Sequence, residues 1–154
     1  MEEVSKKGAK EVALKILSSR WRSEKEIEKR LKDKGFEEGT IEETISWLKE
    51  FGYTDDEKFG HQWAKYRIEN RSYGLIRISY ELNEKGVDRQ IITTIVDRLR
   101  DEFDERKIAM AAAEKKVKGM QKSQSALRKL YGYLMRKGFP PTIVIDVMED
   151  IEWE

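Results

Sequence analysis

The chain has 154 residues, a net charge of +1 and no cysteine, which excludes disulfides, thiolate metal sites and cysteine nucleophiles. Charged residues make up 40% and apolar residues 38% of it, and the apolar residues recur with helical spacing. This combination indicates folded helices with solvated faces and not disorder. No apolar run approaches the roughly eighteen residues that a membrane span needs, and the first residues lack a signal peptide's apolar core. We therefore expect a soluble cytoplasmic protein without membrane contact.

The near-neutral total hides segments of alternating sign. Residues 1–35 carry 11 basic and 7 acidic side chains, whereas residues 36–60 carry 2 and 8. Basic residues dominate again in 61–80 (4 against 1) and in 102–139 (10 against 4). The final segment, 140–154, has 5 acidic and no basic side chains. Such segregation creates local potentials that favour charged partners even when the whole chain is close to neutral.

A Lys-Gly pair occurs three times, with its glycines at positions 35, 86 and 138, spaced 51 and 52 residues apart. Apolar residues stand eight and four positions before each glycine and one, six, ten and thirteen positions after it. These eighteen repeat positions are Ile27, Leu31, Phe36, Ile41, Ile45 and Leu48, then Ile78, Leu82, Val87, Ile92, Val96 and Leu99, then Leu130, Leu134, Phe139, Val144, Met148 and Ile151. Steps of three and four place them on one face of a helix, and a glycine between two such faces suits a left-handed helix end. The sequence therefore predicts three tandem copies of a module of about fifty residues.

Each copy contains a helix, a glycine turn and a second helix. A further helix precedes each pair, near residues 5–19, 55–70 and 103–118. No segment shows the alternating pattern of a strand. We predict an all-α fold of three tandem three-helix modules of the helix-turn-helix kind, forming an elongated curved array. The predicted modules are residues 1–52, 53–102 and 103–154.

Several helix boundaries carry their own signals. Ser23 followed by Glu26 is a capping box, and Thr54 or Asp55 can cap the helix that follows. Nothing between Asp88 and Gly119 breaks a helix, so the last helix of the second module and the first of the third are either continuous or separated. We favour a break near residues 101–104.

Catalytic chemistry finds little support. His61 is the only histidine, so the usual transition-metal site is not available. Asp55, Asp56 and Glu57 resemble a carboxylate cluster, but their place at a helix start favours capping of free amides. The glycines are isolated and form no phosphate-binding loop, and no serine lies in a nucleophile context. We predict a protein that is not an enzyme and uses no metal and no cofactor.

The corresponding corner of each module is basic, and aromatic residues are interleaved in two of the three. One interpretation is solvated helix ends with long side chains lying over apolar surface. The other is an intermittent cationic track for nucleic-acid phosphates or an acidic protein groove. Both stay open. The residues concerned are Arg20, Trp21 and Arg22 in the first module, Lys65, Arg67, Arg71, Tyr73 and Arg77 in the second, and Lys115, Lys116, Lys118, Lys122, Arg128 and Lys129 in the third.

Three of the four tryptophans raise a packing question. We expect Trp21 and Trp47 to be core or interface-core residues, not exposed stacking platforms. Trp153, beside the acidic end of the chain, either packs the last helix onto its module or stays exposed.

Ordered motifs over the first two modules resemble the RecX family. They are Ser23-Glu24-x-Glu26-Ile27 with Leu31-x-x-Lys34-Gly35, then Leu48-x-x-x-Gly52-Tyr53-x-Asp55-Asp56-x-x-Phe59, then Gly74-x-x-Arg77-Ile78 and Glu81-Leu82-x-x-Lys85-Gly86-Val87. Gly60 departs from the alanine that is usual in the family, and the third module matches mainly through its Lys-Gly pair.

The resemblance implies a regulator of recombination and DNA repair that binds the RecA–DNA filament in its groove and inhibits or modulates its extension, ATP hydrolysis and strand exchange. It implies contact with DNA that is weak or made within the filament, and we expect a monomer. Two other functions stay open: a helical-repeat protein that binds DNA independently of RecA, and a scaffold for another protein. The direction of regulation is also open.

Overall fold

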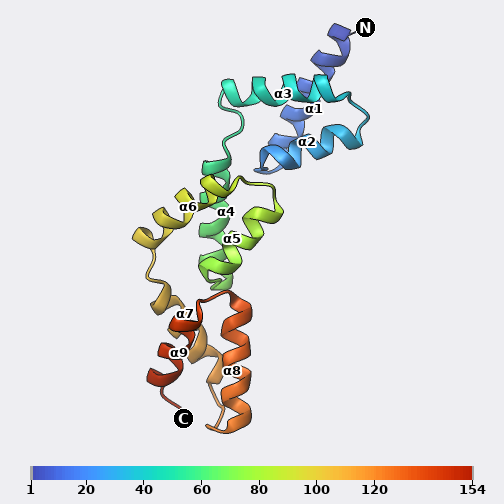
Figure 1. Ribbon diagram of the computed structural model, residues 1–154. Helices are drawn as coiled ribbons and strands as arrows, with labels where there is room; N and C mark the ends of the chain where they lie inside the picture. The colour runs from blue at the N-terminus through green and yellow to red at the C-terminus, as the bar shows by residue number, and fades with distance from the viewer. Residues whose placement is uncertain (1, 154) are drawn as a thin grey trace. The chain divides into compact units, whose positions relative to one another are not determined.

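The computed structural model describes residues 2–153, with side chains from residue 7 onward. This part of the chain forms nine α-helices and no strand (Figure 1). Their bounds are α1 Glu2–Ser19, α2 Glu24–Asp33, α3 Glu38–Glu50, α4 Asp56–Arg71, α5 Leu75–Glu84, α6 Arg89–Glu102, α7 Glu105–Val117, α8 Gln124–Lys137 and α9 Pro141–Asp150. The predicted all-α fold of tandem three-helix modules is confirmed.

Contacts group the described chain into two compact units. The first contains the residues up to 61 together with 82–92, and the second contains 62–81 and the residues from 93 onward. The division runs through α4, α5 and α6, so the module boundaries of the sequence analysis stay a prediction. Each unit is described by itself.

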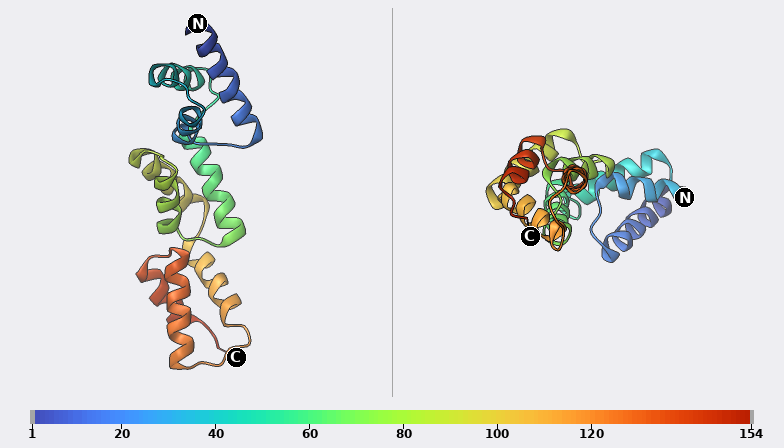
Figure 2. Two further views of the ribbon diagram at one scale, coloured as in Figure 1. Left: turned by 90° about the vertical axis from the view of Figure 1, so that its right-hand side faces the viewer. Right: turned by 90° about the horizontal axis from the view of Figure 1, so that it is seen from below.

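The core of the first unit is formed by α1, α2 and α3, which pack against one another (Figure 2). Ile27, Leu31 and Leu48 are completely buried, together with Ala13 from α1. Half-buried side chains of α1 and α3, including Trp47, pack around them. Trp47 is therefore a core residue at the module edge, as expected.

In the second unit, α7, α8 and α9 pack together around a separate core (Figure 1). Leu130, Leu134 and Val144 are buried in this core. The side of α7 that faces it consists largely of alanines, whose small side chains let the helices approach closely. The half-buried Trp153 packs against the same core. Across the chain, each of the eighteen repeat positions is buried or half-buried.

Helix ends follow the predicted signals. Ser23 and Glu26 form a complete capping box, in which the Glu26 amide donates to Ser23 Oγ at 3.2 Å and the Ser23 amide donates to Glu26 Oε1 at 3.1 Å. Of the two alternatives for α4, Asp55 is the cap, since its Oδ1 accepts from the Lys58 amide at 3.1 Å. Thr54 Oγ1 is buried without a hydrogen-bond partner.

The Lys-Gly glycines and the break after α6 also match expectation. Gly35, Gly86 and Gly138 have φ values of +91°, +82° and +92°, the left-handed region where a side chain would be strained. α6 ends at Glu102 and α7 begins at Glu105, with Asp104 Oδ1 accepting from the Lys107 amide at 3.2 Å.

A repeated pair of hydrogen bonds joins successive modules. Within the first unit, Ser23 Oγ donates to the carbonyl of Lys85 at 2.6 Å, and the Glu24 amide donates to Asp56 Oδ1 at 2.9 Å. The N-terminus of a module's middle helix thus contacts the next module's Lys-Gly turn and the first carboxylate of its first helix. We call this contact the module junction.

The second junction, within the second unit, uses the corresponding acceptors, but a backbone amide takes the place of the serine hydroxyl. The Gly74 amide donates to the carbonyl of Lys137 at 2.7 Å, and the Leu75 amide donates to Glu105 Oε2 at 2.7 Å. Here the two backbones touch, because a Cβ on Gly74 would lie 2.6 Å from the backbone nitrogen of Phe139. Such a distance is too short for any side chain, so Gly74 is required for the contact.

Replacing Gly74 by alanine is expected to lower the free energy of unfolding by about 1–3 kcal/mol, because the added methyl group must displace the Gly138–Phe139 backbone. Urea unfolding followed by circular dichroism measures the change. Gly39→Ala, in a helical position with open space around it, is the matched control and is expected to be neutral or stabilising by up to about 1 kcal/mol. Equal stability of the two variants would contradict the tight junction.

The junction carboxylate Glu105 should respond to pH. Burial raises its pKa above the ordinary value of 4.5, although the Leu75 amide opposes the shift. The folded state therefore holds the proton more tightly than the unfolded chain does. In consequence, Glu105 reduces stability progressively as pH rises from the ordinary carboxyl range through its raised pKa.

Glu105→Gln keeps an acceptor for the Leu75 amide without the buried charge, so the loss of stability with rising pH is expected to diminish. Glu105→Ala leaves that amide without its partner and is expected to cost about 1–2 kcal/mol at acidic pH, with a smaller cost as pH rises because the variant also lacks the buried charge. Thermal unfolding between about pH 4 and about pH 8 tests both variants. The exposed Glu114→Gln on the same helix is the control; the same pH profile for Glu105→Gln as for the control would argue against the assignment.

Candidate binding surface

The turn between α4 and α5 places an aromatic ring in the second unit. α4 ends at Arg71. The next residue, Ser72, is a non-glycine residue with a left-handed φ of +55°, and its amide donates to the carbonyl of Ile68 at 3.0 Å. This reversal sets Tyr73 directly before the Gly74 contact with the third module. A strained residue here indicates that the surrounding contacts determine the turn.

Three cations surround the half-buried ring of Tyr73. The guanidinium of Arg77 lies 3.9 Å from the ring centroid, that of Arg67 lies 4.6 Å away, and Lys137 Nζ lies 5.2 Å away. Cations at these distances are attracted by the electron-rich face of the ring. Tyr73 thus collects positive charge from α4, α5 and the end of α8.

Glu81 pairs with two of these cations, and Arg77 Nε lies 3.5 Å from its Oε1. Arg67 forms a two-point ion pair with it, with Nη2–Oε1 at 2.7 Å and Nε–Oε2 at 3.0 Å, and Trp63 Nε1 also donates to Oε2 at 3.0 Å. Burial alone would raise the pKa of Glu81, but the hydrogen bond and the charge of Arg67 lower it below the ordinary value. The Glu81 hydrogen bond in turn raises the pKa of Arg67. The charge of Arg67 is therefore neutralised within the protein by Glu81.

Backbone carbonyls accept hydrogen bonds from two cations of this surface. Lys137 Nζ donates to the carbonyl of Arg71 at 2.6 Å, and Arg77 Nη1 donates to the carbonyl of Arg136 at 3.0 Å. Burial and then the charges of Arg77, Arg71 and Lys115 lower the pKa of Lys137. Within the described chain, Arg71, Lys115 and Lys137 form no ion pair with a carboxylate.

A second tyrosine extends this arrangement along α8. Lys116 and Lys137 lie 5.0 Å and 5.3 Å from the ring centroid of Tyr133. The whole set is called the basic cluster, and its members are Arg67, Arg71, Arg77, Lys115, Lys116 and Lys137 around the rings of Tyr73 and Tyr133. Among these six cations, Glu81 is the carboxylate that forms ion pairs with Arg67 and Arg77, so the basic cluster has a clear excess of positive charge.

The first predicted corner differs from expectation in two adjacent residues. Trp21 is 53% exposed, so the expectation of a core position is wrong, whereas Arg22 is only 9% exposed and is not available as a surface contact. Both lie in the short non-helical segment between α1 and α2, where helical periodicity does not determine which side chain turns inward. Arg20 is exposed and lies 3.6 Å from Glu26.

In the other two corners the structure brings some predicted residues together and leaves others apart. Six of the predicted residues belong to the basic cluster: Arg67, Arg71, Tyr73, Arg77, Lys115 and Lys116. No contact in the described chain joins the remaining predicted cations to the cluster, and all of them are exposed: Lys65, Lys118, Lys122, Arg128 and Lys129.

Sequence reasoning did not include Lys137 and Tyr133 among the site residues. Lys137 was visible as half of the third Lys-Gly pair, but a lysine at a helix end is sufficiently explained by the helix dipole. Only the junction shows that this turn meets Tyr73, which lies 64 positions earlier in the sequence. Tyr133, one turn before Lys137 on α8, could have been found with it.

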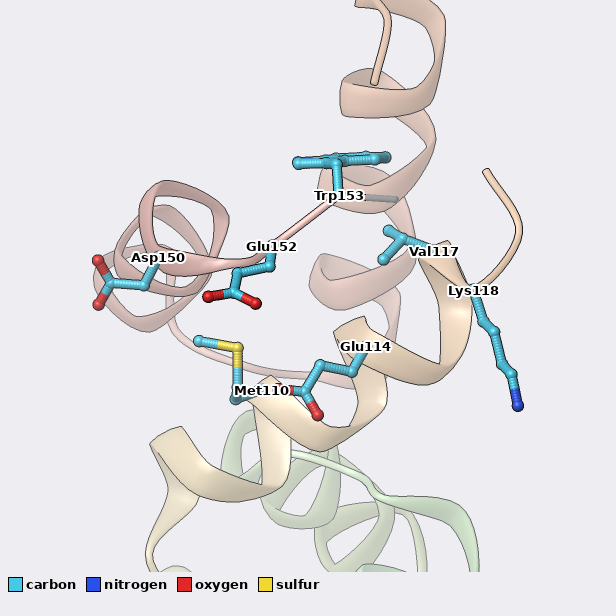
Figure 3. A pocket seen from close by; sticks show the side chains of 7 residues that line it. All are labelled: Met110, Glu114, Val117, Lys118, Asp150, Glu152 and Trp153. Atoms are coloured by element: carbon cyan, nitrogen blue, oxygen red, sulfur yellow. The ribbon is translucent and has the colours of Figure 1, made fainter. Parts of the chain in front are cut away.

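The described surface also has an open hollow of about 620 Å³ beside α7 and the segment after α9 (Figure 3). Met110, Glu114, Glu152 and Trp153 are among its lining residues, but it combines no nucleophile with a base. Its Asp150 is already paired with Arg106. In the described residues no group of three metal-ligand side chains comes together, and no helix there is long and apolar enough to cross a membrane.

Comparison with known families gives the decisive observation. The family models of the first, second and third three-helix domains of RecX match residues 9–48, 55–94 and 104–148. This chain belongs to the RecX family of regulatory proteins. The three matches follow the three copies of the repeat in order.

RecX relatives and a RecX structure agree with this assignment. Regulatory protein RecX of Clostridium perfringens is 36% identical over 134 residues, which cover 84% of this chain but only 62% of the relative. Regulatory protein RecX of Amycolatopsis mediterranei is 32% identical over 146 residues, covering 94% and 83%. A crystal structure of RecX from Lactobacillus salivarius has a TM-score of 0.86 with 21% identity, covers 96% of this chain and 97% of that chain, and supports the fold.

Removing the carboxylate that Arg67, Arg77 and Trp63 share should weaken the fold of this RecX-family chain. Glu81→Gln is expected to lower the free energy of unfolding by about 1–3 kcal/mol at neutral pH, because a partly buried arginine loses its charged partner. The lowered pKa of Glu81 stabilises the folded state above the ordinary carboxyl range, and this stabilisation is lost as pH falls through the lowered value.

Chemical unfolding at several pH values measures this difference between wild type and Glu81→Gln, which should shrink towards about pH 3. Glu84→Gln, at an exposed position of the same helix, is the control and should show no such trend. A difference that stays constant from neutral to acid pH would contradict the role given to the Glu81 charge.

Proposed function

We propose that this chain regulates recombination and DNA repair by binding the RecA–DNA filament and inhibiting or modulating its extension, ATP hydrolysis and strand exchange. Membership of the RecX family supports the general assignment. The observation that supports this binding site is the excess of positive charge in the basic cluster, where one carboxylate forms ion pairs among six cations. A surface of this kind favours an anionic partner such as a phosphate backbone or an acidic protein groove.

Tandem modules suit a partner that itself repeats. Several modest contacts on one chain bind more tightly together than separately, because the later contacts form within one complex. The proposed mode of action is therefore binding without catalysis, with no cofactor, by a monomer in the cytoplasm. DNA contacts are proposed to be weak or to form within the filament.

The exposed cations of the basic cluster should be needed for this activity. The combined variant Arg71→Glu, Lys115→Glu and Lys116→Glu reverses charge while leaving the Arg67–Glu81 pair and the junction bonds unchanged. The concentration that gives half the effect on RecA ATP hydrolysis on single-stranded DNA is expected to rise at least about tenfold, as lost phosphate or carboxylate contacts require.

A charge-matched control separates local contacts from net charge. Lys7→Glu, Lys29→Glu and Lys32→Glu change the same total charge at exposed positions outside the cluster. This control should change the half-effect concentration by no more than about threefold. Equal losses in both variants would contradict a localised site, and no effect of the wild type on hydrolysis or filament length would contradict the proposed function.

A second candidate is binding of DNA without RecA, which the same positive excess favours. It predicts appreciable affinity for naked DNA that falls steeply with salt, in proportion to the phosphates neutralised. Binding measured against naked DNA, free RecA and the RecA–DNA filament distinguishes the two functions. Preference for the filament supports the first, and equal binding to naked DNA and filament supports the second.

A further inference from the structure

The first unit contains a buried arginine that forms no ion pair within the described residues. Arg22 is 9% exposed, and its Nε is covered without a hydrogen-bond partner. Within the described chain, Arg22 forms no ion pair, since Glu26 is engaged by Arg20 and Lys85, each at 3.6 Å. Burial, then Arg20, then Arg30 lower the pKa of Arg22, and the charge of Glu26 opposes this shift only in part. A buried charge is normally paired, so this one lacks an expected partner.

A cavity adjoins this guanidinium. It has a volume of about 230 Å³ and lies between the segment after α1 and the turn from α3 into α4. Arg22 and Thr54 both line it, and the hydroxyl of Thr54, a residue that is 5% exposed, is also buried without a partner. Two residues with unsatisfied buried polar atoms thus line one cavity, which is unusual because buried polar atoms are nearly always hydrogen-bonded.

The remaining lining gives the cavity an aromatic rim and a further cation. Trp21 and Tyr53 line it and are 53% and 51% exposed. Tyr53 is supported from within the unit by Trp47, with ring centroids 5.4 Å apart. Lys58, in the first turn of α4, adds a second positive side chain to the lining. Exposed aromatic side chains around a cationic pocket are typical of protein-binding hot spots.

We propose that this cavity binds the carboxylate of an acidic peptide segment of a partner protein, with an apolar neighbour of that residue lying across Trp21 and Tyr53. Arg22 supplies the charge-assisted hydrogen bonds, and Thr54 supplies a neutral donor. The cavity shares no residue with the basic cluster, so this site goes beyond the proposed function and is tested separately.

The charges around the cavity favour a single carboxylate over a nucleic-acid strand. Asp55 belongs to its lining, and Asp56 and Glu57 follow directly in the first turn of α4. A strand carries one phosphate per nucleotide and would bring successive negative charges beside these three carboxylates. One side-chain carboxylate introduces a single charge and fits a volume of about 230 Å³.

The probes are the peptide acetyl-Leu-Glu-Leu-amide, its Gln analogue and a short oligothymidylate, each titrated into the full chain labelled with ¹⁵N. The readout is the Trp21 indole N–H signal together with the amide signals of Tyr53 and Thr54. The Glu peptide is expected to shift these signals, and the Gln analogue to bind at least about tenfold more weakly, because the charge-assisted bonds are lost.

Arg22→Met tests the role of the guanidinium and distinguishes a binding site from a structural one. If Arg22 binds the ligand, the variant is expected to lose the response to the Glu peptide. Its melting temperature is expected to be unchanged or raised, because an unpaired buried charge is removed. A lowered melting temperature with an unchanged peptide response would assign Arg22 a structural role and overturn the proposal. Should the variant fail to fold, Thr54→Val and the exposed Trp21→Ala are read instead, and each should weaken binding of the Glu peptide.

Three further results would overturn the proposal. They are the absence of a shift with the Glu peptide up to about 10 mM, equal binding of the Glu and Gln peptides, and displacement of the Glu peptide by the oligothymidylate. The last result would assign the cavity to nucleic acid. None of these measurements uses RecA, so they are independent of the outcome for the basic cluster.

Discussion

The module junction is the contact on which the rest of the structure depends. Each helix begins with amides and ends with carbonyls that have no partner inside the helix. At both junctions, the start of a middle helix donates two hydrogen bonds to the next module. One acceptor is the carbonyl of the Lys-Gly turn, at the end of that module's middle helix, and the other is the first carboxylate of its first helix. A single module would leave these groups to water, so tandem arrangement is part of how each helix end is satisfied. This also explains why contacts divide the chain through the second module, since each junction lies within one unit.

The two junctions use corresponding hydrogen-bond acceptors but differ in charge. At the first, Lys85 of the Lys-Gly turn lies 3.6 Å from Glu26, which neutralises it. At the second, the equivalent Lys137 meets the carbonyl of Arg71 and the cations around Tyr73. The replacement of Ser23 by Gly74 at the equivalent position lets the two backbones touch and brings Arg77 to the carbonyl of Arg136. One repeated geometry thus gives a neutral contact in one place and a cationic surface in the other.

Much of the fold could be predicted from periodicity. The spacing around Gly35, Gly86 and Gly138 located the cores, the left-handed turns and the helix order, because each depends on neighbours within one module. The basic cluster could be predicted only in part, because Arg71 and Lys137 are 66 residues apart in the sequence and meet through the junction. The exposure of Trp21 and the burial of Arg22 could not be predicted, because a short segment between helices has no periodicity that determines which side chain is buried.

The basic cluster and Arg22 illustrate the same physical relation between stability and binding. Cations gathered without matching carboxylates repel one another, and the lowered pKa values of Lys137 and Arg22 are both consequences of burial and neighbouring positive charge. This repulsion reduces what such groups contribute to the stability of the free chain, whereas an anion placed beside them relieves it and strengthens both binding and folding. The carboxylates that are placed for stability, Glu81 and Glu26, compensate only part of the positive charge. The uncompensated remainder is the charge that the proposed anionic partners would neutralise.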